Sequence, residues 1–223
     1  AIDGKTAGAV DASDATTVTG NATSLQTFYT AAGITGKGNE AASVTDTSLD
    51  GATLNLINSY TTGAVAVQAS TLTGSTAELN TAYDKEALDP KEITGIGDEA
   101  ITINDTTLAA TDLIELEIET SGDINAGSIT TLEGSVLKVD EAYDQYADAG
   151  DTQITNLGDE QVTLTDGSLP ADKVKEVNAH TTGAVNAAAA GTITGSATNV
   201  KDVYTAKGSS GNTITGLGNE AVT

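Results

Sequence analysis

Four versions of one string decide the fold of this chain: ITGKGNEAASVTD from Ile34, ITGIGDEAITIND from Ile93, ITNLGDEQVTLTD from Ile154 and ITGLGNEAVT from Ile214. Their first residues are 59, 61 and 60 positions apart. Self-similarity at a fixed period of this length is typical of solenoids, propellers and tandem arrays. The sequence therefore predicts one continuous repeat array over residues 1–223, and we expect it to be an excerpt from a longer array. Its predicted parts are a partial repeat 1–33, the repeats 34–92, 93–153 and 154–213, and a partial repeat 214–223.

Each repeat contains two related halves, which a short threonine-rich string makes visible. The string is a hydroxyl residue, an apolar residue, a polar residue and then Gly or Asp, as in TLTG from Thr71 and TLTD from Thr163. This alternation predicts a strand with its apolar residue facing inward. The apolar centres, about 29 residues apart on average, are Val18, Val44, Leu72, Ile103, Leu132, Leu164 and Ile193. A second short strand is predicted before each, around Val10, Ile34, Val65, Ile93, Ile124, Ile154, Val185 and Ile214.

After the threonine-rich string the apolar spacing becomes helical. Pairs four residues apart share a helix face: Leu25 and Tyr29, Leu79 and Tyr83, Val139 and Tyr143, Val200 and Tyr204. In the other halves the expected helix-face residues are Leu49, Leu54 and Ile57, then Leu108, Leu113 and Leu116, then Leu169, Val174 and Val177. Ser75 with Glu78 predicts a capping box, Pro170 predicts a first helical turn, and Gly33, Gly63, Gly122 and Gly183 predict helix ends.

The predicted fold class is α/β, a tandem-repeat solenoid of about 29-residue strand-strand-helix coils paired into repeats of about 60 residues. A coil this short cannot close its own core, so neighbouring repeats of the same chain must be its partners. For the same reason we expect end-to-end self-association. The sequence leaves open whether strands pair between coils or whether both strands of a coil share one sheet.

Composition limits the function classes. Leu, Ile, Val and Phe make up 45 of 223 residues and the net charge is −23, which approaches the disordered regime, but the periodic apolar pattern favours order. The 32 acidic and 9 basic side chains argue against nucleic acid. With no Cys and one His, the sequence excludes disulfides, cysteine-ligated zinc and a histidine cluster. No stretch approaches a membrane span, so we expect no membrane insertion.

Oxygen-rich loops are the candidate metal sites. GIGDE with IND, and NLGDE with LTD, concentrate carboxylates, and hard cations such as calcium take six to eight oxygen ligands. The candidate ligands are Asp98, Glu99, Asp105, Asp159, Glu160 and Asp166. The alternative is a turn in which Asp105 and Asp166 prepare a helix N-terminus. We expect no cofactor, with calcium as the alternative.

Other motifs have plainer interpretations. The T-x-T strings resemble ice-binding faces, but Asn104 and Glu133 interrupt them, and threonine suits a half-exposed strand. His180 stands where other repeats have Tyr60 and Glu119, so no catalysis is expected there. The tyrosines that recur at one helical position are expected to cap the core between coils.

The strings ITGLGNEAVT, TDTSL, TTGAV and TITGSAT resemble the tandem repeats of giant cyanobacterial cell-surface proteins, such as the large swimming-motility surface protein of marine Synechococcus. The resemblance spans the chain and implies an extracellular or cell-surface scaffold or adhesin-like protein. We therefore expect a non-enzymatic structural segment, a spacer or surface array. The alternative is a calcium-stabilised adhesin-type binding module, or less readily an ice- or glycan-binding face.

Overall fold

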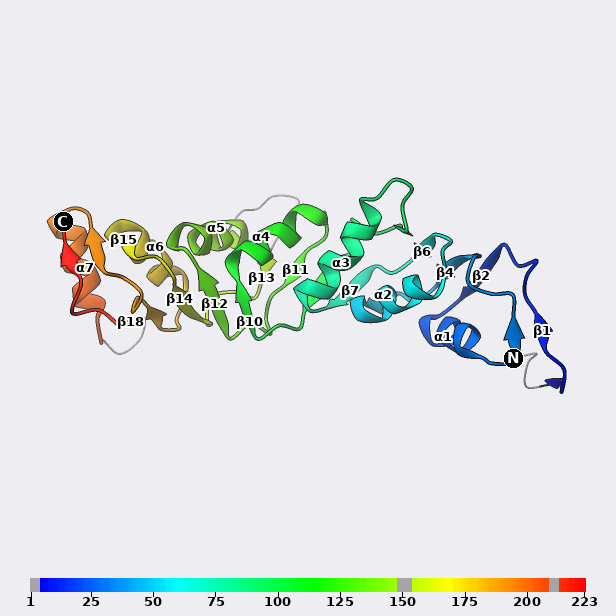
Figure 1. Ribbon diagram of the computed structural model, residues 1–223. Coiled ribbons are helices and arrows are strands. Elements are labelled where there is room, and N and C mark those ends of the chain that lie inside the picture. The colour runs from blue at the N-terminus through cyan, green and yellow to red at the C-terminus, as the bar shows by residue number, and fades with distance from the viewer. Residues whose placement is uncertain (1–4, 148–153, 209–212) are drawn as a thin grey trace. The chain divides into compact units, whose positions relative to one another are not determined.

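The computed structural model describes residues 5–147, 154–208 and 213–223. The chain divides into two compact units, the N-terminal unit of residues 1–102 with 119–122 and the C-terminal unit of residues 103–118 with 123–223. In both units short strands alternate with helices (Figure 1). The predicted repeat boundary between residues 153 and 154 adjoins segment 148–153, which lies outside the described residues.

The elements of the N-terminal unit follow the predicted order. Its helices are α1 (Ala22–Thr30), α2 (Gly51–Tyr60) and α3 (Thr76–Glu86). Its strands are β1 (Val10–Asp11), β2 (Thr17–Gly20), β3 (Ile34–Thr35), β4 (Ala41–Val44), β5 (Ser48–Asp50), β6 (Val65–Val67), β7 (Thr71–Gly74), β8 (Ile93–Thr94) and β9 (Ala100–Ile103), which ends at the boundary.

The C-terminal unit repeats the same order. Its helices are α4 (Ala110–Glu119), α5 (Val136–Ala147), α6 (Ala171–His180) and α7 (Ala197–Ala206). Its strands are β10 (Thr107–Ala109), β11 (Ile124–Asn125), β12 (Thr131–Gly134), β13 (Ile154–Thr155), β14 (Gln161–Leu164), β15 (Ser168–Pro170), β16 (Val185–Asn186), β17 (Thr192–Thr194), β18 (Ile214–Thr215) and β19 (Ala221–Val222).

The strand-strand-helix coil is confirmed, but alternate coils carry a third short strand directly before the helix, namely β5, β10 or β15. Leu49, Leu108 and Leu169 lie on these strands, so their predicted place on a helix face is wrong. The reason is clear at Leu49, because the next residue is the N-cap of α2. Asp50 is extended and its carboxylate accepts a 2.9 Å hydrogen bond from the Thr53 amide, and a helix cannot begin before its N-cap.

Strands pair in parallel between coils, and the strands of one coil do not share a sheet. In the C-terminal unit one sheet has the order β10-β12-β14-β16-β18 and another β15-β17-β19. The N-terminal unit has the orders β2-β4-β6-β8 and β1-β3. This settles the question that the sequence leaves open, since every described ladder joins successive coils.

Successive strands of one sheet do not come from equivalent positions in their coils. The sheet from β10 to β18 begins with the third strand of one coil, continues with the second strands of two coils and ends with the first strands of two more. Leu132 therefore lies opposite Val162, not opposite Leu164 of the equivalent string. Threonine-rich strings of neighbouring coils are thus not register partners.

Helix faces predicted from the 3.6-residue period form the core. Leu54, Ile57, Leu113 and Val174 have no exposed side-chain surface. The predicted capping box is also confirmed, because the Ser75 hydroxyl and the Glu78 carboxylate each accept a backbone amide at the start of α3. Periodicity and capping residues therefore place these helices correctly.

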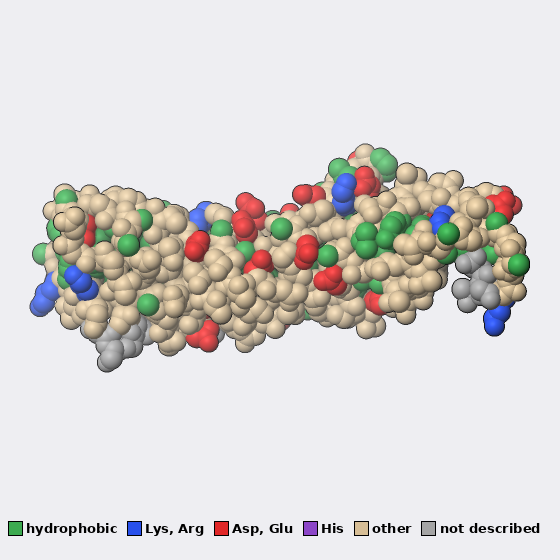
Figure 2. Space-filling view, turned by 60° about the horizontal axis from the view of Figure 1, so that its bottom comes forward, with side chains coloured by type: hydrophobic (Ala, Val, Ile, Leu, Met, Phe, Trp, Pro, Cys, Tyr) green, Lys and Arg blue, Asp and Glu red, His purple; other side chains and the backbone are tan. Residues whose placement is uncertain are grey.

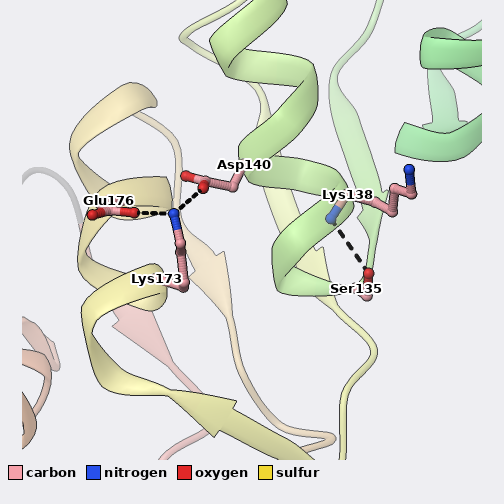
Figure 3. Close-up of polar contacts among 5 residues, drawn as sticks. All are labelled: Ser135, Lys138, Asp140, Lys173 and Glu176. Atoms are coloured by element: carbon pink, nitrogen blue, oxygen red, sulfur yellow. Dashed lines mark hydrogen bonds and ion pairs between the residues drawn. The ribbon is translucent and has the colours of Figure 1, made fainter. Parts of the chain in front are cut away.

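Salt bridges between side chains also join neighbouring helices (Figure 3). Lys173 of α6 lies with its amino nitrogen 2.6 Å from an oxygen of Asp140 on α5 and 2.6 Å from one of Glu176 on its own helix. The next pair, α6 and α7, is bridged by Lys175 and Asp202 at 2.7 Å. The few basic side chains thus contribute to contacts between coils.

Acidic side chains are dispersed over the face shown in Figure 2, singly or in small groups. Over the described residues, the helices are all too short or too polar to cross a membrane.

Candidate functional site

The structure separates the carboxylates that the sequence groups in the Gly-Asx-Glu loops. Glu99 and Glu160 are each only 2% exposed, whereas Asp98 and Asp159 point into solvent. Among the described residues, no three His, Cys, Asp or Glu side chains are grouped so as to hold a metal ion. In each loop the predicted metal ligands are therefore separated, with the glutamate buried and the aspartate exposed to solvent.

The buried Glu160 carboxylate is fully engaged within the C-terminal unit. One oxygen, Oε2, accepts hydrogen bonds from the amides of Gly158 at 2.8 Å and Asp159 at 3.2 Å. The other, Oε1, accepts a short hydrogen bond from the Tyr143 hydroxyl. Tyr143 lies on α5 and Glu160 in the loop between β13 and β14, so the bond joins two successive coils.

The same arrangement recurs at the other loops. Glu99 accepts amides at 2.7 and 3.1 Å and the Tyr83 hydroxyl, and Glu220 accepts amides at 2.6 and 2.9 Å and the Tyr204 hydroxyl. Glu40 accepts amides at 2.8 and 3.1 Å. Its Oε1 and the Tyr29 hydroxyl are buried and form no hydrogen bond of normal geometry, although burial and the neighbouring Glu40 raise the pKa of Tyr29, so this site is a looser version of the others.

The main chain of the glutamate is held by a third segment. The Thr181 hydroxyl donates to the Glu160 carbonyl at 2.6 Å and itself accepts from the Gly183 amide at 2.9 Å. The Thr182 amide donates to the Gly158 carbonyl at 2.7 Å. We call this set of tyrosine, glutamate, threonine and glycine the node, and equivalent threonine contacts occur at Thr61 with Glu40 and at Thr120 with Glu99.

The glycine of each node is required by close approach, not by helix capping. A Cβ atom on Gly183 would lie 2.1 Å from the Glu160 carbonyl oxygen, and the distances at Gly122 and Gly63 would be 2.3 and 2.4 Å. Helices α2, α4 and α6 end before these glycines, at Tyr60, Glu119 and His180. The prediction that helices end just before these glycines is therefore confirmed, but none of the three has the left-handed φ of a C-cap glycine.

The electrostatics of the node favour a charged glutamate beside a neutral tyrosine. Burial, with the adjacent glutamates, raises the pKa of Tyr83 and Tyr143 far above the usual value. At the last loop, partial burial opposes ionisation of Glu220, but hydrogen bonds from Tyr204 and the loop amides lower its pKa to about 2. The hydrogen bond to Glu220 correspondingly raises the pKa of Tyr204 to about 12.

Two aspartates that end threonine-rich strings, Asp46 and Asp166, each cap a helix, but not the helix that follows the string. Asp166 accepts a 2.6 Å hydrogen bond from the amide of Val136, the first residue of α5 in the preceding coil. Asp46 accepts the Ala22 amide at the start of α1 at the same distance. Asp105 occupies the equivalent sequence position and is half-buried. The capping interpretation is confirmed for Asp166, with the preceding helix as its partner.

His180 takes part in packing at its node. Its ring stacks on that of Tyr143 with centroids 5.2 Å apart, as Tyr60 stacks on Tyr29 at 5.5 Å. Beside it is a polar surface groove of about 590 Å³, lined by Gly127, Asn156, Leu157, Gly158, Asp159 and His180. Asn156 has a left-handed φ of 61° where other loops have glycine, and its amide donates to the Asn125 oxygen at 2.9 Å.

On the ladder of β12, β14 and β16 the outward threonines do not form a row. Glu133 lies opposite Thr163, and Thr163 lies opposite Asn186 in the next strand. The shifted register places different residue types side by side, so the regular threonine lattice of an ice-binding face does not arise on this ladder.

Sequence reasoning missed the hydrogen bond between tyrosine and glutamate. The signal is present, because three of the pairs are separated by 16, 17 and 16 residues. The apolar spacing places each tyrosine in the core and the loop string places each glutamate in a turn, and neither pattern indicates that the two side chains meet.

Comparisons with protein-family models, with curated proteins and with solved structures gave no match.

Proposed function

We propose that this chain is a non-enzymatic structural repeat segment, a spacer or surface array, of a large extracellular or cell-surface protein. The observation that carries the proposal is the use of the recurring polar residues. Glu99, Glu160 and their tyrosines and threonines are engaged in contacts between successive coils. Residues that recur in order to hold coils together favour a structural role over a chemical one.

Charge and composition support the proposed location. A net charge of −23 keeps a repetitive chain soluble, and a chain without cysteine is unaffected by the redox state of its surroundings. The dispersed acidic side chains of Figure 2 suit a solvated exterior surface.

A calcium-stabilised adhesin-type binding module is the second candidate. Asp98 and Asp159 favour it, because both are exposed beside their loops, and Asp159 also lines the polar groove. Calcium would need several further oxygen ligands, and the neighbouring Glu99 and Glu160 carboxylates already accept hydrogen bonds.

Thermal unfolding with calcium, magnesium or EDTA tests the choice. At about 5 mM metal, above the dissociation constants of extracellular calcium modules, we expect the same melting temperature in calcium and magnesium at equal ionic strength. Asp98→Asn with Asp159→Asn should leave that equality unchanged. The matched control is Asp84→Asn with Asp144→Asn, which alters the charge equally at exposed helix positions. A calcium-specific rise that only the loop variant abolishes would establish the binding module instead.

A further inference from the structure

We infer that the polar surface groove beside His180, in the C-terminal unit, is a binding site for a small neutral carbohydrate. The groove encloses about 590 Å³, a volume within the range of small-molecule sites. The inference goes beyond the proposed structural function, because it assigns a ligand to one place in the array.

The first sign of a special site is an asparagine where the repeat has glycine. The other three loops carry Gly36, Gly95 and Gly216 at this position, each in the left-handed region with φ of 70°, 78° and 81°. Asn156 keeps that conformation with a φ of 61°, in a region that glycine enters freely and a residue with a side chain seldom does. One loop of the four therefore gives up the favoured glycine and gains an amide side chain.

A glycine in the facing coil makes room for this side chain. At the loop of Gly216, the facing residue is Ala188, and a Cβ atom on Gly216 would lie 2.5 Å from the Ala188 nitrogen and 2.7 Å from its Cβ. At the loop of Asn156, the residue in the place of Ala188 is Gly127. A Cβ atom added to Gly127 would lie 3.2 Å from the Asn156 Cβ, which is closer than ordinary contact. The gain of a side chain on one coil is thus matched by the loss of one on the next.

The side chain of Asn125 fixes the amide of Asn156. Its oxygen accepts hydrogen bonds from the Asn156 side-chain nitrogen at 2.9 Å and from the Gly127 backbone amide at 3.0 Å. The Asn156 Oδ1 atom has no donor among the residues that the structure describes. A fixed amide with a free acceptor suits a ligand hydroxyl, because little side-chain entropy is lost when the ligand binds.

His180 is a second departure from the repeat, and it lines the same groove. The equivalent positions carry Tyr60 and Glu119. The His180 ring is held by stacking on Tyr143, and its carbonyl oxygen lies beside the loop, within 3.3 Å of where a Cβ atom on Gly158 would be. Two changes that are far apart in sequence thus meet at one surface feature, which favours a common ligand over independent drift.

The lining residues favour an uncharged ligand that is rich in hydroxyl groups. Asn156 Oδ1 and the exposed Asp159 carboxylate accept hydrogen bonds, and the imidazole of His180 offers a donor and an acceptor. Leu157, 6% exposed, adds a small apolar surface that suits the C–H groups of a sugar ring. Asp159 would repel an anion, and the described residues that line the groove include no lysine or arginine.

Titration of the isotopically labelled chain, followed by nuclear magnetic resonance, tests the site. The probes are the methyl glycosides of glucose, galactose, mannose and N-acetylglucosamine, each added to about 50 mM, because an open groove with few polar groups should bind in the millimolar range. At least one glycoside should shift the backbone amides of Gly158 and Asp159 saturably, and glycerol at equal hydroxyl concentration should not. The absence of a saturable shift with all of these glycosides would overturn the inference. Shifts with calcium or zinc, and none with a glycoside, would overturn it in favour of a cation site.

Variants that restore the repeat test which residues carry the binding. Asn156→Gly with His180→Tyr introduces residues that other coils already use at these positions, so the fold should be kept, and affinity for the glycoside should fall by about tenfold or more. Asp159→Ala should also lower the affinity, whereas Asp144→Ala, at an exposed position on α5 outside the groove, should leave it unchanged. Equal affinity in the unmodified chain and the double variant would overturn the inference while leaving the structural function, which the calcium experiment tests, untouched.

Discussion

Replacing Tyr143 with Phe removes one hydroxyl group from the node of the C-terminal unit and leaves the ring in place. That hydroxyl donates to Oε1 of Glu160, a carboxylate that is 2% exposed. A hydrogen bond to a charged group contributes about 1.5–3 kcal/mol, and a buried oxygen left without its donor costs a similar amount. We therefore expect Tyr143→Phe to lower the free energy of unfolding by about 1.5–3 kcal/mol. For a chain of this length that lowers the melting temperature by about 3–12 °C.

Tyr29 provides a matched control. It occupies the equivalent helix position and is 7% exposed, but its hydroxyl lies near Glu40 without a hydrogen bond of normal geometry. Tyr29→Phe removes only this weaker interaction, so it should lower the free energy of unfolding by clearly less than Tyr143→Phe does. Urea unfolding followed by far-ultraviolet circular dichroism measures both variants. Equal losses at Tyr143 and Tyr29 would refute the assignment of the node as an energetic contact between coils.

Three further predictions test packing, close approach and ionisation. Leu113 is fully buried, so Leu113→Ala should lower the free energy of unfolding by about 2–5 kcal/mol, whereas Thr163→Ala on a strand surface should change it by no more than about 0.5 kcal/mol. Equal losses for the two variants in urea unfolding would contradict the helix-face assignment. Gly183→Ala should cost about 1–3 kcal/mol of unfolding free energy, because its Cβ would lie 2.1 Å from the Glu160 carbonyl oxygen. Gly8→Ala, where a Cβ meets no close contact, should be neutral or stabilise by up to about 1 kcal/mol. The reverse order in thermal melts would be inconsistent with the node. In the folded chain the pKa of Tyr204 is raised to about 12, and those of Tyr83 and Tyr143 are also raised. The stability that these tyrosines confer is therefore fully present below pH about 10 and is lost as the pH rises through their folded pKa values. Phenolate absorbance showing that every tyrosine of the folded chain ionises near pH about 10 would contradict this.

The period and the helices are predictable from the sequence because they depend on local spacing. Leu54 and Ile57, or Leu79 and Tyr83, share a face by the geometry of the helix alone, and the structure buries them as expected. The capping box at Ser75 is equally local. Such features require no knowledge of what lies in the neighbouring coil.

The register between coils is not predictable in this way. Similar strings suggest that equivalent strands pair, yet Leu72 lies opposite Leu49 of a third strand. The third strand escapes prediction because Leu49 has the same apolar character on a strand as on a helix. Only its position before the N-cap Asp50 separates the two, and that depends on where the helix begins.

The candidate site was only partly predictable for a related reason. Asp166 is correctly identified as a helix cap, but its helix belongs to the preceding coil. The carboxylates of Glu99 and Glu160 look like metal ligands in a loop sequence, since the tyrosines that bind them are 16 and 17 residues away. A pairing across coils is visible only once the stacking is known.

The account depends most on parallel pairing of successive coils in the shifted register, and an engineered disulfide tests that directly. Glu133 lies opposite Thr163, whereas alignment of the equivalent strings would place it opposite Thr165. Neighbouring strands are about 4.8 Å apart, within the range a disulfide spans, and a residue two positions further along lies at or beyond its limit. Glu133→Cys with Thr163→Cys should form an intramolecular disulfide under mild oxidation, detected by mass spectrometry of the digested chain, and Glu133→Cys with Thr165→Cys should remain largely reduced. Preferential oxidation of the Thr165 variant would contradict the account.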